Sequence, residues 1–362
     1  MKSKIVLFIA LFFAILSCVD PYDPGLVGKD KKIVVDCQIT DRPDFIKLQL
    51  TYSAGYNSKE GVFDTFAFNG NVTIRDDKGK VFDFQEDERK TGLYVSTVPI
   101  KAEVGRAYTL QIKINGKTYT STAEKLLPVA DITRITSKYE KNTGIKPPAI
   151  GRFDLFVDTK DPAERTDFYR WTWKHYDRLT YCKVARQAGG GGEANPPFEG
   201  FFCCSPCWSV EPCIGCIYIA SDAFANGSLI ARQSIGSVPY DSRDPYYIVI
   251  EQQSLSRDAY TYWKTVKDQS SNSGGIFDAP PTFIKGNMTN PTDKNEIVLG
   301  FFSVSSVATK AFYLDRSQTF EPFGTVQVRA PTVFSANCEV CREGPLRTNI
   351  KPEGWFDLGG RL

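Results

Sequence analysis

Cysteine is the residue type with the most chemistry to offer in this chain, because a thiol can be oxidised or bound to a metal. The chain has ten cysteines among 362 residues. Eight of them lie in its second half: Cys182, Cys203, Cys204, Cys207, Cys213, Cys216, Cys338 and Cys341. Several are separated by two residues, a spacing that suits tetrahedral zinc, a redox dithiol or a structural disulfide.

The cellular compartment decides between these three uses. Disulfides persist outside the cytoplasm. If the chain is exported, we therefore expect the eight cysteines to form structural disulfides that staple a long loop and the tail to the rest of the protein. Zinc binding and redox chemistry are the alternatives. Eight cysteines can pair in about a hundred ways, so the sequence leaves the connectivity open.

The N-terminus carries the pattern of an export signal. Two lysines precede the apolar run Ile5–Ile15, which is too short to span a bilayer, where about 20 residues are needed. The run has the length of a signal-peptide core, and the Ser17-Cys18 step that follows resembles a bacterial lipoprotein processing site. We expect residues 1–17 to be a signal peptide, with cleavage before Cys18 and lipidation of this cysteine. An ordinary secretory signal is the alternative.

Other residues give little sign of catalysis. His175 is the one histidine, and the chain has neither a G-x-S-x-G elbow nor an H-E-x-x-H zinc motif. Four glycines at 189–192 lack the Lys-Ser/Thr of a phosphate loop. We therefore predict no enzyme, no cofactor and no metal, with a cryptic hydrolase that uses paired carboxylates as the alternative.

Tryptophans near the cysteines are candidates for a binding surface. Trp171 and Trp173 lie in a segment dense in aromatic residues, and Trp208 lies beside the cysteine cluster. Aromatic side chains are enriched at the centres of interfaces. They are also common in protein cores, so burial of these three residues is the alternative interpretation.

The charge balance excludes some partners. The chain has 44 Lys and Arg against 42 Asp and Glu, and two of the lysines belong to the expected signal peptide. The mature chain would then have no formal net charge. This argues against a nucleic-acid-binding protein, which usually carries a basic patch, and against docking on a membrane through basic residues alone.

The pattern of apolar residues predicts a mainly β fold. After a tether over 18–31, we expect strands at 33–39, 45–52, 71–75, 80–84, 92–97, 107–114 and 117–123. Seven short strands with turns such as Asn115-Gly116 predict an immunoglobulin-like β-sandwich domain over 32–127. Cys37 falls on the apolar face of the first strand, which predicts a buried free thiol.

A second, larger β-rich domain is expected over 128–362. It has candidate strands at 131–137, 153–158, 168–176, 246–253, 296–304 and 311–314, and loops at 142–150 and 186–200. Its clearest helix runs over 256–268, with Ser256 as the N-cap. Ala259, Tyr262, Trp263 and Val266 share the apolar face of this amphipathic helix.

Several segments, taken in order, resemble the DUF4249 family, lipoproteins of the Bacteroidota whose name records an unknown function. The segments are Cys18 with Asp20-Pro21-Tyr22; 33–41; Gly105-Arg106-Ala107-Tyr108; Tyr119-Thr120-Ser121; Phe168-Tyr169-Arg170-Trp171; 252–256; 259–263; Gly275-Ile276-Phe277-Asp278; Lys285-Gly286-Asn287; 298–302; Cys338 to Cys341; and 351–355. The resemblance implies an outer-membrane lipoprotein that is often encoded beside a TonB-dependent receptor. The family supplies no catalytic residues to carry over.

The function implied by this resemblance is binding. We expect an outer-membrane lipoprotein that acts as an accessory or ligand-capturing partner of a TonB-dependent, SusC-like barrel, with an unknown ligand. Asp20 and Asp23 follow Cys18 closely and resemble a surface-export signal, so we expect the protein to face the cell surface, with a periplasmic orientation as the alternative. A structural or assembly subunit of a larger outer-membrane complex is the alternative function.

Overall fold

The computed structural model describes residues 31–54, 62–141, 151–163, 166–186, 198–222, 227–241, 245–271, 282–319, 333–334 and 337–355. The expected signal peptide, Cys18, all of the tether but residue 31, the loop at 142–150 and the glycine run at 189–192 lie outside these residues. The described part is mainly β, as predicted, with one long helix, α2 (Arg257–Ser271). Among these residues no helix is long and apolar enough to cross a membrane.

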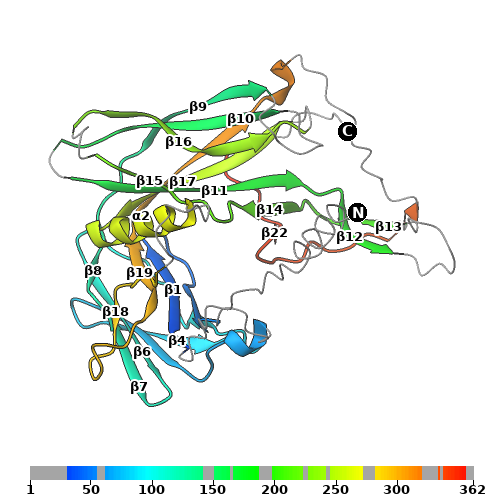
Figure 1. The fold of residues 1–362 in the computed structure, drawn as a ribbon. Coiled ribbons are helices and arrows are strands. Elements are labelled where there is room, and N and C mark those ends of the chain that lie inside the picture. Colours follow the sequence, from blue (N-terminus) through cyan, green and yellow to red (C-terminus); the bar gives the residue numbers. More distant parts are fainter. Residues whose placement is uncertain are drawn as a thin grey trace, which may run out of the picture.

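A ten-stranded sheet forms the lower part of the molecule in Figure 1. Its strands are β1 (Ile33–Thr40), β2 (Lys47–Tyr52), β3 (Asn71–Asp76), β4 (Val81–Glu86), β5 (Leu93–Ser96), β6 (Ala107–Ile114), β7 (Lys117–Ser121), β8 (Glu124–Lys125), β18 (Met288–Thr289) and β19 (Leu299–Ser305). A 3₁₀ turn, η1 (Val62–Thr65), follows β2. The seven strands expected from the sequence correspond to β1–β7, which confirms those predictions.

Strict alternation explains why this sheet curls around one core. In β1, Val35, Cys37 and Ile39 are buried while the residues between them face outward. The same period recurs in β3 and β6, and the inward side chains form one apolar cluster. Cys37 is a free and buried cysteine, as predicted. Burial raises the pKa of its thiol far above the usual range.

The structure adds to the expected sandwich two strands from far downstream. β19 pairs in parallel with β1 over Val34 to Thr40, and β18 pairs with β7. A bridge between Lys285 and Leu299 brings the two ends of the strand order together, so the sheet is nearly closed into a barrel. Residues 288–305 therefore complete the sheet that residues 32–127 begin.

Two further sheets pack together in the upper part of the molecule (Figure 1). One contains β9 (Ile132–Lys141), β10 (Gly151–Lys160) and β16 (Leu229–Pro239). The other contains β11 (Phe168–Arg178), β14 (Trp208–Pro212), β15 (Tyr218–Ser221), β17 (Tyr246–Leu255), β20 (Val307–Leu314) and β22 (Arg347–Thr348). A 3₁₀ turn, η2 (Arg316–Gln318), follows β20. The core between the sheets is rich in aromatic residues and includes Tyr169, Trp171 and Tyr240.

Helix α2 lies between the upper and lower parts (Figure 1). Ser256 is its N-cap, as predicted, because the Ser256 Oγ accepts a hydrogen bond from the Ala259 N–H at 3.1 Å. Ala259 is buried, and Tyr262 and Trp263 pack against Phe168 and Phe301 of the neighbouring strands. The apolar face of the helix thus covers β11 and β19 where they meet.

A small fourth sheet projects at the right of Figure 1. It contains β12 (Tyr181–Arg186), β13 (Phe198–Phe202) and β21 (Val333–Phe334). β12 follows β11 after two residues, and β14 brings the chain back to the six-stranded sheet. This sheet is therefore an extension of β11, and the cysteines are concentrated at its base.

Candidate functional site

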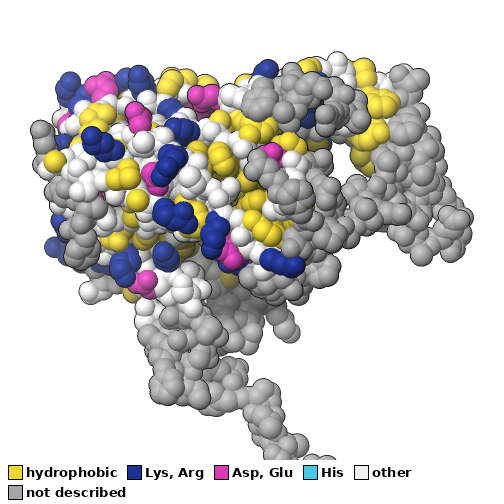
Figure 2. Space-filling view, turned by 90° about the horizontal axis from the view of Figure 1, so that it is seen from above, with side chains coloured by type: hydrophobic (Ala, Val, Ile, Leu, Met, Phe, Trp, Pro, Cys, Tyr) yellow, Lys and Arg dark blue, Asp and Glu magenta, His cyan; other side chains and the backbone are white. Residues whose placement is uncertain are grey.

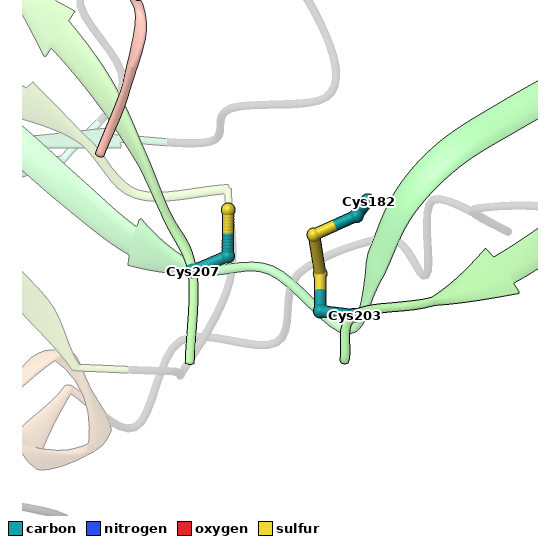
Figure 3. Close-up of side chains that lie close together, drawn as sticks. All are labelled: Cys182, Cys203 and Cys207. Atoms are coloured by element: carbon teal, nitrogen blue, oxygen red, sulfur yellow. A yellow bond between two sulfur atoms is a disulfide. The ribbon is translucent and has the colours of Figure 1, made fainter. Parts of the chain in front are cut away.

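Eight cysteines form four disulfides at the base of this extension. The pairs are Cys182–Cys203, Cys204–Cys338, Cys207–Cys341 and Cys213–Cys216. We call residues 179–186, 198–216 and 337–350 the stapled module. Figure 3 shows the bond between Cys182 and Cys203, with Cys207 on the neighbouring segment. The sequence left these connections open.

Two of the disulfides join segments that run side by side. Cys204–Cys338 and Cys207–Cys341 each join cysteines 134 positions apart. In both segments, two residues separate the first cysteine from the second. The backbone continues this arrangement: the Cys204 N–H donates to the Glu339 carbonyl at 3.0 Å, and the Glu339 N–H donates to the Phe202 carbonyl at 2.8 Å. The tail is thus attached in parallel to the segment that follows β13.

Cystine replaces aliphatic packing in the core of the module. Cys182, Cys207 and Cys341 are buried against one another, with Leu179 and Cys203 at the edge. A small disulfide-rich unit is stable with little apolar core, because the cross-links restrict its unfolded states. These sulfurs lie close enough together to suggest a metal site, but each is bonded to another sulfur and offers no thiolate for zinc.

Aromatic contacts fix the tail to the six-stranded sheet. The Trp355 ring lies 6.0 Å from that of Trp208 and 5.1 Å from that of Tyr247, centroid to centroid, both nearly edge to face. Arg347 donates to the Cys182 carbonyl at 2.7 Å. The module is therefore held together by disulfides, and the chain that follows it packs on the six-stranded sheet.

The surface of the module is unusually apolar. Six large hydrophobic side chains on it are exposed, and Ile214, between Cys213 and Cys216, is 90% exposed. The six are Val184, Phe202, Ile214, Val340, Leu346 and Ile350. Figure 2 shows hydrophobic side chains gathered toward the end where β12 and β13 lie, whereas Lys, Arg, Asp and Glu are interspersed over the part that contains β9, β10 and β16.

Cavities among the described residues include one in the module and one on the ten-stranded sheet. One of about 220 Å³ lies in the module and is lined by Cys182, Lys183, Glu339, Val340, Arg342 and Arg347. The other, of about 360 Å³, lies on the outer face of β1 and β2 and is lined partly by Asp36, Gln38 and Gln49. Asp36 and Gln38 are outward members of the alternation that buries Val35 and Cys37 in β1, and Gln49 has the same place between the buried Leu48 and Leu50 of β2.

Two of the three tryptophans of the expected binding surface are buried, and the third, Trp173, is half-buried. Trp171 is 0% exposed and Trp208 is 3% exposed, so that interpretation is wrong for both. The Trp171 Nε1–H donates to the Gln252 Oε1 at 2.8 Å, and the Trp173 Nε1–H donates to the Ile235 carbonyl at 3.0 Å. At its start, β11 is covered on one face by the three-stranded sheet and on the other by α2. Its aromatic residues there are therefore part of the core.

His175 has a structural environment. It is buried, and its Nδ1 lies 2.8 Å from the Tyr247 carbonyl oxygen. Its Nε2 lies 2.8 Å from the Asp177 Oδ2, and its ring stacks on Tyr246 at 3.6 Å between centroids. The ring nitrogens are thus engaged with the protein itself.

Sequence reasoning missed two groups of residues. The first is the exposed apolar set of the module. Its signal in the sequence was single aliphatic residues, such as Ile214, in a segment that is rich in cysteine and shows no helix or strand periodicity. The second is a buried group of Asp161, Asp167 and Asp222, which no spacing connects because the last of them is 55 residues from its neighbour.

Comparisons with known proteins bear on the family. The model of the family described as "Domain of unknown function (DUF4249)" matches residues 19–311. No curated protein matches the chain. Among solved structures, the chain is similar to that of a DUF4785 family protein from Legionella pneumophila subsp. pneumophila str. Philadelphia 1, at 11% identity and a TM-score of 0.19. That similarity covers 61% of this chain and 52% of the other, about half its length. On the family match, which covers most of its residues, the chain belongs to the DUF4249 family.

Proposed function

We propose that this protein is a lipid-anchored outer-membrane protein that docks on a TonB-dependent barrel through the stapled module. The single observation that carries the proposal is the exposure of six large apolar side chains on a unit that four disulfides hold rigid. A rigid apolar surface loses little conformational entropy when it binds a partner.

The N-terminal sequence supports the membrane part of the proposal. Cys18 closely follows an apolar run with the length of a signal-peptide core. Lipidation of its amine and thiol adds more than one acyl chain, and stable anchoring requires two membrane signals. The balanced charge of the mature chain leaves the lipid as the main attachment.

The partner is expected to be apolar where it meets the module. Exposed hydrophobic residues that gather on one surface mark protein or membrane interaction sites. An anchored protein meets barrel proteins of the same membrane at high effective concentration. The resemblance to lipoproteins encoded beside TonB-dependent receptors supports a barrel of this class as the partner, and the cavity beside Asp36 and Gln38 is a candidate place for a captured ligand.

Purification of the tagged lipoprotein from detergent-solubilised outer membranes, read by mass spectrometry, tests the proposal. We expect a TonB-dependent barrel in near-stoichiometric amount. In the double variant Leu346→Asp, Ile350→Asp, the recovered barrel should fall at least about tenfold, because charge in an apolar contact costs well over 1.4 kcal/mol.

The matched control is Val98→Asp with Val104→Asp, two exposed valines next to strands of the ten-stranded sheet. This variant should retain the barrel. A wild-type protein that purifies alone would overturn the proposal, as would equal loss in both variants. A different envelope protein as the stoichiometric partner would favour the structural or assembly role.

A further inference from the structure

Three aspartates from separate segments meet at one end of the upper sheets. Asp161 follows β10, Asp167 precedes β11, and Asp222 follows β15. One carboxylate oxygen of each lies within 4.8 Å of the other two. The residues are 2%, 3% and 0% exposed. This end lies at the left of Figure 1, away from the stapled module.

Within the described part of the chain, a buried oxygen of Asp222 has no hydrogen-bond partner. The Tyr169 hydroxyl donates to the Asp161 Oδ1 at 2.6 Å, and the Asp167 N–H donates to the Asp222 Oδ2 at 2.8 Å. The Gly227 N–H lies 3.3 Å from the Asp161 Oδ2. Among the described residues, the Asp222 Oδ1 accepts no hydrogen bond, although it is buried. Buried carboxylate oxygens are normally paired with a donor or bound to a metal.

The electrostatics of the group point the same way. Three carboxyl groups lie together here in a region closed to solvent, with no basic side chain among the hydrogen-bond partners given above. Like charges that share a buried site disfavour each other's ionised form. A cation among them would remove this repulsion and supply the missing partner of the Asp222 Oδ1.

We propose that Asp161, Asp167 and Asp222 form a binding site for a calcium ion. Calcium takes oxygen ligands at 2.3–2.6 Å in flexible geometry, so oxygens on opposite sides of the ion lie up to about 5 Å apart. The separations here fall within that limit. Magnesium requires shorter bonds in a near-octahedral arrangement and keeps several waters, for which a buried group of three carboxylates is less suitable.

A bound ion would join the two upper sheets. Asp161 extends from β10 in the three-stranded sheet, while Asp167 and Asp222 flank β11 and β15 in the six-stranded sheet. The Asp161 N–H donates to the Ser228 carbonyl, and the Asp222 N–H donates to the Asp167 carbonyl, both at 3.1 Å. Each of these bonds lies within one sheet, whereas the Tyr169 hydroxyl of β11, which donates to the Asp161 Oδ1, already links the two sheets. Calcium would lock this end of the sheets. The inference does not depend on the proposed function.

Calcium titration of the mature chain, first freed of metal with a chelator, tests this site. We expect millimolar calcium to raise the Tm by about 3–5 °C, as for a site with Kd on the order of 10⁻⁴ M. Terbium should give tyrosine-sensitised luminescence, because the Tyr169 hydroxyl lies against Asp161, and calcium should quench this signal by displacement. Absence of any response to calcium, or an equal response to magnesium, would overturn the assignment.

The variants Asp222→Asn and Asp161→Asn should each lose the calcium response and weaken binding at least tenfold. Either one suffices if the other does not fold. Asp158→Asn is the matched control, because Asp158 is equally buried on β10 but is paired with Arg134 and with the Arg232 N–H. It should lower the Tm and keep the full calcium response. A calcium response retained in Asp222→Asn, or lost in Asp158→Asn, would contradict the site.

Discussion

The side chain of Asn287 pairs with the backbone of Phe302 as another strand would. Its Nδ2–H donates to the Phe302 carbonyl at 2.9 Å, and its Oδ1 accepts from the Phe302 N–H at 3.0 Å. The same amide donates to the Glu124 Oε1 at 3.1 Å. Asn287 precedes β18 and Phe302 lies in β19, so this amide helps to close the ten-stranded sheet where its two ends meet.

Replacement of Asn287 by alanine should destabilise the protein by about 2–4 kcal/mol, because two buried backbone groups of Phe302 lose their partner. Urea unfolding measures the change. Asn295→Ala, at an exposed position near the same sheet, should cost under about 0.5 kcal/mol. Equal effects of the two substitutions would show that the Asn287 amide does not help to close the ten-stranded sheet.

Glycine at position 300 allows β1 and β19 to pair. Gly300 has φ +82°, and a Cβ there would lie 1.9 Å from the Val35 carbonyl oxygen. Gly300→Ala should therefore cost more than about 3 kcal/mol, with reduced yield of folded protein. Gly105→Ala provides the control, because its φ is +87° with open space around it, and it should cost about 1–2 kcal/mol from backbone strain alone. Similar costs in the two variants would exclude a close approach at Gly300.

The two long-range disulfides should be partly redundant. Without Cys204–Cys338, the bond Cys207–Cys341 still closes the same long loop, so replacement of the first pair by serine should cost only about 2–3 kcal/mol. Removal of both pairs should cost about 5 kcal/mol more, because the long loop then opens. Thermal unfolding and proteolysis of the tail measure both steps. If replacing the first pair alone lowered stability as much as replacing both pairs, the two disulfides would not be redundant.

Acid should reduce the contribution of Asp158 to stability. The Arg232 N–H and then Arg134 hold the pKa of this carboxyl below its usual value. A carboxylate with a lowered pKa stabilises the fold above its unfolded pKa, near 3.9, and loses that contribution as the pH falls through the folded value. Asp158→Asn should therefore cost about 1–3 kcal/mol near pH 6 and much less near pH 3. A cost that does not change with pH would refute this assignment.

Local pattern predicted the first seven strands, because burial alternates along β1, β3 and β6, but it named none of the strands from β12 to β16. Positions 33, 35, 37 and 39 share the buried face of β1, and the turn at Asn115-Gly116 joins β6 to β7 as expected. Periodicity fixes which face of a strand is buried but not which strand lies beside it. The parallel pairing of β1 with β19 therefore had no local signal. Nor did the sequence show that residues 288–305, expected in the second domain, join the sheet of the first.

The candidate sites were predicted less well, for related reasons. The spacing of Cys204 and Cys207 suited a shared zinc ion, a redox dithiol or a disulfide. Each instead bonds to a cysteine 134 positions away. The aromatic segment around Trp171 allowed either a binding surface or a core, because a strand covered on both faces has no polar alternation to show which face is exposed. Asp161, Asp167 and Asp222 come together only when two sheets pack, which a pattern within one segment does not report.

Site-specific photocrosslinking in living cells tests the docking of the stapled module most directly. A photoreactive residue at Ile350 or Ile214, both exposed on the module, is compared with one at Val104, exposed next to the ten-stranded sheet. The account predicts crosslinks to a TonB-dependent barrel from positions 350 and 214 and none from position 104. Crosslinks from position 104 alone, or from none of the three, would contradict docking through the module.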